Sequence, residues 1–222
     1  MIDTVTVIGS GRVGSAVSAR LRARGVAVSA DAGDLALLCV PDSAIPSVAR
    51  SIPLGPWVAH VSGATPLAAL DPHERRFSVH PLQTFSLGRG AEQLDGAWAA
   101  VTTETDEAHA IATWLAETLG LTPFDLADGA RTLYHAGAVF ASNYIVTLQR
   151  AATLLFEAAN APPAALEPLM LGTIENGFEL TGPISRGDWA TVEAHREAIH
   201  AQLSQLDHLY ETLAGATVAL AT

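Results

Sequence analysis

Three glycines near the start of the chain have the spacing of a phosphate-binding turn. The pattern G-x-G-x-x-G lies between a predicted strand at residues 4–8 and a predicted helix at residues 12–24. Glycines here permit a tight turn and close approach of a diphosphate, and the first N–H groups of a helix attract anions. We therefore predict a dinucleotide-binding turn; the alternative is a turn that binds nothing. The turn consists of Gly9, Ser10, Gly11, Arg12, Val13 and Gly14.

The segment after this helix is short for a dinucleotide site. A ribose-binding carboxylate is expected about 20 residues beyond the glycines, where Asp31 and Asp34 are the candidates. Only residues 30–34 separate the second predicted strand, 26–29, from the third, 35–40, whereas a parallel crossover normally takes about a dozen residues. We expect the second strand to be edge-like, antiparallel or absent, with its crossover helix deleted. The adenosine half of the site would then be incomplete.

Two histidines are candidates for proton transfer. His80 follows a predicted strand at residues 76–79, and His135 lies in a predicted helix. An imidazole has an unperturbed pKa of about 6.5, so it can exchange a proton near neutral pH. Either residue could be the acid/base group, and we favour His80. The structural alternatives are a histidine that caps a strand end and, for His135, a polar group between two domains.

Ligands of open α/β sheets bind beyond the carboxyl ends of the strands. This rule brings further candidates to the same crevice. His135 and Ser142 are seven residues apart and would share a helix face, with Asn143 further round. Ser142 and Asn143 could orient a substrate carbonyl or carboxylate, and Arg186 could anchor a carboxylate or pair with Asp188. Predicted cofactor contacts are Val40, Pro41, Asp42 and Ser62; predicted substrate contacts are Gln83, Thr84 and Arg186.

The order of predicted elements defines the fold class. Strands alternate with helices up to about residue 127, which predicts a doubly wound, mostly parallel α/β sheet. Beyond that point the pattern becomes purely helical, with expected helices at 128–160, 163–180 and 188–219. We expect a dinucleotide-binding domain at 1–127 and an all-α domain for substrate binding and dimerisation at 128–222.

Composition excludes several classes of function. The net charge is −11, all twelve basic residues are Arg, and Lys is absent, which argues against binding to nucleic acid or anionic membranes and excludes Schiff-base chemistry. With 49% hydrophobic residues, the chain has apolar surface to cover, and a homodimer is expected. No apolar run is long enough to span a membrane. The single Cys39 indicates a reducing, cytoplasmic location. The spacing of His195, His200 and His208 predicts no metal site.

Several motifs together resemble a known group of proteins. The motifs are the run from Val7 to Gly14, Val40-Pro41-Asp42, His60-Val61-Ser62-Gly63-Ala64, His80-Pro81-Leu82-Gln83-Thr84-Phe85, Tyr134-His135, Ser142-Asn143, Thr181-Gly182-Pro183 and Arg186-Gly187-Asp188. They resemble Rossmann-like proteins of the 6-phosphogluconate dehydrogenase-like superfamily whose helical half is domain of unknown function 2520. The resemblance covers nearly the whole chain. It implies an NAD or NADP cofactor but no common substrate, and the Lys–Asn pair of related dehydrogenases cannot operate without Lys.

Two hypotheses follow from the sequence. The first is an NAD(P)-dependent oxidoreductase that acts on a small carbonyl, imine or hydroxy-acid substrate, with His80 or His135 handling the proton. The second is a non-redox ligand-binding or assembly protein that kept the fold but lost the adenosine pocket. The shortened segment at residues 30–34 supports the second hypothesis, and the glycine turn supports the first.

Overall fold

A computed structural model describes residues 2–30 and 33–220 of the chain, which form two compact units. The first, which we call the sheet unit, is Met1–Ser142, and the second, the helical unit, is Asn143–Thr222. The predicted boundary after residue 127 marks the change to helices, whereas the compact sheet unit continues through helix α4 (Arg131–Ala141). The functional boundary at residue 127 stays a prediction.

The sheet unit contains one seven-stranded sheet in the order β2-β1-β3-β4-β5-β6-β7. Every neighbouring pair is parallel except β5 and β6, as the sequence predicted for a mostly parallel sheet. The strands are β1 (Thr4–Ile8), β2 (Ala27–Ser29), β3 (Leu35–Leu38), β4 (Trp57–His60), β5 (Arg76–Leu82), β6 (Trp98–Thr103) and β7 (Thr122–Asp125).

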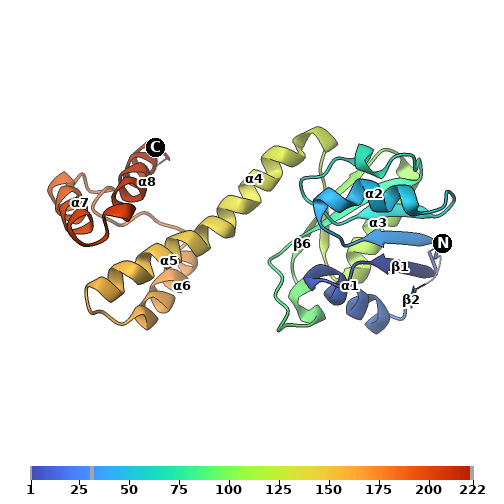
Figure 1. The fold of residues 1–222 in the computed structure, drawn as a ribbon, viewed down its shortest axis with the longest axis horizontal. Coiled ribbons are helices and arrows are strands. Elements are labelled where there is room, and N and C mark those ends of the chain that lie inside the picture. The colour runs from blue at the N-terminus through green and yellow to red at the C-terminus, as the bar shows by residue number, and fades with distance from the viewer. Residues whose placement is uncertain (1, 31–32, 221–222) are drawn as a thin grey trace. The chain divides into compact units, whose positions relative to one another are not determined.

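Helices cover both faces of this sheet (Figure 1). Helices α1 (Arg12–Ala23) and α3 (Asp106–Leu119) pack on one face, around a core that includes Phe77 and Leu37. Helix α2 (Ile45–Ser51) covers the other face. Coverage of both faces explains why β3 is apolar throughout, since parallel strands are usually buried on both sides.

The link between β2 and β3 is as short as the sequence predicted. β2 is an edge strand, as one alternative had it; it is parallel to β1, and no described residue of the link is helical. The register explains how so short a link can cross. Ser29 is level with Thr6 and Leu35 with Val5, so the chain returns by about one residue while it crosses roughly 10 Å of sheet. Five residues can span that distance. Residues 31–32 lie outside the described part.

The helical unit consists of α5 (Asn143–Ala158), α6 (Leu166–Glu175), α7 (Trp189–Leu203) and α8 (Asp207–Leu220). Two of the long helices predicted from the sequence are therefore interrupted. The first break is at Ser142, whose hydroxyl donates to the carbonyl oxygen of Ala138 at 2.6 Å, a bond that often bends helices. The second is a 3₁₀ turn at Ser204–Leu206. The Asp188 side chain caps α7 by accepting a hydrogen bond from the N–H group of Thr191.

Candidate active site

The glycine turn lies where the strand order reverses. The chain leaves β1 to form β2 on one side and returns to form β3 on the other, so the carboxyl ends of β1 and β3 border a switch point. A Cβ atom at Gly9, where φ is +114°, would lie 2.3 Å from the carbonyl oxygen of Cys39. A Cβ atom at Gly14 would lie 2.0 Å from that of Gly9. Both glycines are required by close backbone packing.

Gly11 has a different role, because nothing lies within 4 Å of the position its Cβ would occupy. It is exposed, as are Ser10 and Arg12, and it forms the N-terminal boundary of α1. No acidic residue is present in the first turn of α1, so no carboxylate competes for the helix N–H groups. The turn therefore offers open space and a favourable electrostatic field to a diphosphate.

The adenosine end fits a dinucleotide less well. Asp34 was a candidate ribose ligand, but its Oδ2 accepts hydrogen bonds from the N–H groups of Asp3 (2.9 Å) and Thr4 (3.0 Å). This carboxylate therefore stabilises the amino end of β1, opposite the glycine turn, and the prediction for Asp34 is wrong. The other candidate, Asp31, lies outside the described residues.

A cluster of aromatic and imidazole rings lies beyond β4, on strand β5 and helix α4. Nδ1 of His80 is 2.7 Å from the hydroxyl of Tyr134, and the two rings are edge-on with centroids 5.5 Å apart. The ring of His135 is 6.4 Å from that of His80. A side chain at Gly63 would lie 2.7 Å from His80 Cε1 and 3.0 Å from His135 Cδ2, so this glycine leaves room for both rings.

Burial sets the protonation states in this cluster. It lowers the pKa of His80 to about 4, assisted by the nearby charges of His135 and Arg131, while Asp42 acts in the opposite direction. Burial also raises the pKa of Tyr134 to about 12. At neutral pH the pair is therefore a neutral imidazole and a protonated phenol. The sequence-based expectation of an unperturbed His80 is wrong because the ring is removed from water.

Arg131 and Asp128 fix the loop that carries Gly63. Nε of Arg131 donates to Asp128 at 2.9 Å, and Nη1 donates to the carbonyl oxygen of Ser62 at 3.0 Å. Asp128 also accepts from the N–H group of Leu67. The hydroxyl of Ser62 accepts from the N–H groups of Ala64 and Thr65, so Ser62 shapes the loop through both its backbone and its side chain.

Polar atoms without partners lie behind the site. His60 and Ser78 are fully buried neighbours on β4 and β5. Nε2 of His60, Oγ of Ser78 and Nη2 of Arg131 are buried and make no hydrogen bond to other described residues. Burial, with the positive charge of Arg131, lowers the pKa of His60 to about 3. His60 is therefore a buried, neutral side chain close to Arg131 and His80.

The structure brings together some predicted site residues and not others. Val40, Pro41 and Asp42 follow β3 beside the glycine turn, and Asp42 influences the pKa of His80. Gln83 and Thr84 are exposed just after β5, where the Gln83 side chain accepts from the N–H group of Thr84. These residues and the histidine cluster belong to the sheet unit.

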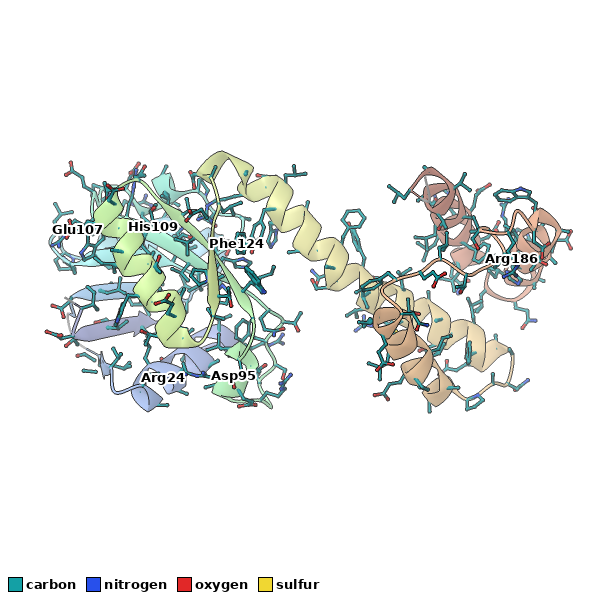
Figure 2. All side chains as sticks on the ribbon, turned by 180° about the vertical axis from the view of Figure 1, so that it is seen from behind. Arg24, Asp95, Glu107, His109, Phe124 and Arg186 are labelled. Carbon is teal, nitrogen blue, oxygen red and sulfur yellow. The ribbon has the colours of Figure 1, made fainter. Side chains whose placement is uncertain are left out.

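The remaining predicted residues are at the end of α4 or in the helical unit. Ser142 does not continue the helix face of His135, because α4 ends at Ala141. Asn143 begins α5, and Arg186 lies in the segment before α7, where Nη1 donates to the carbonyl oxygen of Thr181 at 2.7 Å (Figure 2). The roles predicted for Ser142, Asn143 and Arg186 remain untested predictions.

Sequence reasoning missed the roles of Tyr134, Arg131 and Asp128. Tyr134 is 54 residues from His80, and no periodic pattern connects them. The only available signal was local: an acidic residue three positions before Arg131, at the start of a predicted helix, is a common ion-pair spacing.

The fold is that of known nicotinamide-dependent oxidoreductases. BF3122 of Bacteroides fragilis, named as a candidate NADP oxidoreductase, is 20% identical, with a TM-score of 0.81 and coverage of 98% of each chain. TM1727 of Thermotoga maritima is 22% identical, with a TM-score of 0.76 and 96% coverage of each chain. A reductive aminase from Aspergillus terreus in complex with NADPH is 15% identical, with a TM-score of 0.71, and 99% of this chain and 94% of that one are covered.

Comparison of the sequence with known families identifies the family of this protein. The family described as "Domain of unknown function (DUF2520)" matches residues 97–217, more than half of the chain, so the protein belongs to the DUF2520 family. This confirms the resemblance found in the motifs. No curated protein matches the sequence. Across the described helices, none has the length and apolarity that a membrane span requires.

Proposed function

We propose that this protein is an NAD(P)-dependent oxidoreductase that acts on a small carbonyl, imine or hydroxy-acid substrate. The observation that carries the proposal is the open N-terminus of α1 at the switch point of the sheet, with a half-buried imidazole–phenol pair at the carboxyl side of the same sheet. Gly9 to Gly14 would hold the diphosphate, and Val40, Pro41 and Asp42 would border the cofactor. The bound nicotinamide would supply or accept the hydride.

His80 and Tyr134 would move the accompanying proton. With the Tyr134 hydroxyl donating to Nδ1, the neutral ring carries its proton on Nε2, which can donate it to the oxygen or nitrogen of a substrate. Nδ1 then takes the proton of Tyr134; burial disfavours the resulting phenolate, and the charge of Arg131 offsets part of this effect. Oxidation of an alcohol or amine would use the same path in reverse. His135 is the alternative proton donor.

Two groups of residues complete the proposal. Gln83 and Thr84 would donate hydrogen bonds to the substrate from the loop after β5, and Ser142, Asn143 and Arg186 would contribute from the end of α4 and from the helical unit. The helical unit would also form a homodimer, because α5, α7 and α8 line an apolar groove of about 160 Å³. Light scattering across a dilution series tests the dimer. A cytoplasmic location stays a prediction from the single Cys39.

Cofactor binding tests the proposal directly. NADH and NADPH are titrated against the protein, with nicotinamide fluorescence and thermal shift as readouts. Gly11→Ala should weaken binding by about tenfold or more without loss of thermal stability, because the new methyl group enters the space left for the diphosphate. Gly88→Ala is the matched control, since its Cβ position is also open.

Two results would contradict the proposal. If neither nucleotide binds at millimolar concentration, the oxidoreductase proposal is wrong and a non-redox ligand-binding protein is favoured. If Gly11→Ala and Gly88→Ala bind the cofactor equally well, the diphosphate does not lie at the glycine turn.

A further inference from the structure

A continuous row of aromatic rings leads from the histidine cluster to the surface of the sheet unit. Trp98 on β6 is 6.2 Å from Phe124 on β7, and Phe124 is 6.0 Å from Tyr134, measured between ring centroids. Tyr134 in turn contacts His80. These spacings are those of favourable tilted or edge-to-face aromatic pairs. Tyr134 therefore belongs both to the proton-transfer pair with His80 and to an apolar wall formed by the rings of Tyr134, Phe124 and Trp98.

Strand register shows how this wall is built. Across β5, β6 and β7, His80 pairs with Ala100, and Ala100 pairs with Phe124. Tyr134 contacts the rings at both ends of this row, His80 and Phe124. In the next row towards the end of β5, Leu82 pairs with Trp98. Leu82 is two residues after His80, so both side chains point to the same face.

The second row is open to solvent. Trp98 is 53% exposed and Leu82 is 39% exposed, although both are large apolar side chains near the half-buried His80. Phe124, labelled in Figure 2, lies on β7, is half-buried and borders this surface. We call the surface formed by Leu82, Trp98 and Phe124 the aromatic shelf. None of its three side chains carries a charge.

We propose that the aromatic shelf binds an aromatic or bulky apolar group of the substrate, attached to the carbon that reacts beside His80. This inference rests on the proposed oxidoreductase function and adds the substrate class. The occupant follows from continuity with the site, because Tyr134 joins the shelf to His80. A phenyl group on the shelf would cover apolar surface and stack on indole and phenyl faces, which favours it over a polar group.

Ligand binding without cofactor tests the shelf separately from the reaction. Saturation-transfer NMR is recorded with 3-phenylpropanol and with 1-propanol as probes. The wild-type protein should show contact with the phenyl protons and none with 1-propanol. Trp98→Ala should abolish the phenyl signal, whereas Trp189→Ala should keep it. Trp189 is the matched control, since it is also 53% exposed but lies in the helical unit.

Turnover then tests the link to the reaction. With whichever nucleotide binds, kcat/KM is compared for phenylpyruvate and pyruvate. The ratio should favour phenylpyruvate in the wild type and fall by about tenfold in Trp98→Ala but not in Trp189→Ala. If the wild-type protein binds neither nucleotide but still gives a phenyl signal that depends on Trp98, the oxidoreductase proposal is wrong. The aromatic shelf would then be a binding site without that reaction.

Three results would overturn the shelf proposal. The first is no phenyl signal in the wild-type protein. The second is an equal effect of Trp98→Ala and Trp189→Ala on the phenyl signal or on the kcat/KM ratio. The third is a change to a smaller oligomer in Trp98→Ala, which would show that a second copy of the chain covers the shelf.

Discussion

The sheet unit and the helical unit bury their apolar side chains to different degrees. Among the described residues, all of the buried hydrophobic side chains belong to the sheet unit except Leu166, Val192 and Ile199. The helical unit exposes many large apolar side chains, among them Ile145, Val146, Leu148, Leu154, Leu169, Leu171 and Ile174. A unit of this size needs a substantial core to fold alone. The sheet unit therefore has a hydrophobic core of its own, whereas the helical unit buries few of its apolar side chains, and we expect it to be less stable by itself.

Matched core substitutions should show the largest difference between the units. Leu37 is fully buried in the sheet unit, so Leu37→Ala should lower the free energy of unfolding by about 2–5 kcal/mol at every protein concentration. Leu171 is 51% exposed on α6, so Leu171→Ala should cost less than about 0.5 kcal/mol in dilute protein. Urea unfolding measures both. Equal losses in dilute protein would show that the helical unit has a core of its own.

Acid sensitivity should reside in the sheet unit. His60 and His80 have folded pKa values of about 3 and about 4, both below the unfolded value of about 6.5. As pH falls below 6.5 the unfolded chain binds protons first, so stability is full above that pH and declines towards pH 4. The slope should approach about 1.4 kcal/mol per pH unit for each histidine.

Urea unfolding between pH 7.5 and 4.5 measures this slope, and His80→Gln should reduce it by about one proton. The slope, and not the absolute stability, is the readout, so a generally destabilising effect of the substitution does not affect the result. An unchanged slope in His80→Gln would mean that the ring titrates normally in the folded protein.

Substitutions of the helix caps should have the smallest effect on stability. They distinguish global unfolding from unfolding of one helix. The Thr105 hydroxyl accepts from the N–H group of Ala108 at the start of α3, and Asp188 accepts from that of Thr191 at the start of α7. Each substitution to alanine should cost about 1 kcal/mol. Thr105→Ala should lower global stability, whereas Asp188→Ala should speed amide exchange only within α7. Global acceleration of exchange in Asp188→Ala would show that the units unfold together.

Much of the sheet unit could be predicted from local pattern. The β-branched run before Gly9, the apolar run at Leu35–Leu38 and the change to helices after residue 127 are all visible in the sequence. The edge position of β2 was among the predicted alternatives, whereas its parallel pairing with β1 was not, because strand register cannot be read from the sequence. The break at Ser142, where α4 ends, is not visible in the helical periodicity of the sequence.

The candidate site was predictable only in outline. His80 and His135 were identified by residue type and by their positions near strand ends and in a helix. The state of His80 depends on burial, and its partner Tyr134 comes from a distant helix. Arg131 was missed because its bond to the Ser62 carbonyl connects backbone and side chain across 69 positions. Long-range contacts of this kind are a property of the packed fold.

Cys39 provides a natural reporter for the glycine turn. Its carbonyl oxygen is the atom that excludes a side chain at Gly9, and its Cβ lies close to Gly14. Burial raises the pKa of its thiol to about 12, so the reactive thiolate is scarce while this region is closed. Alkylation of this single, partly exposed thiol should therefore be slow at neutral pH. A bound diphosphate that holds the turn shut would slow that labelling, without any engineered probe.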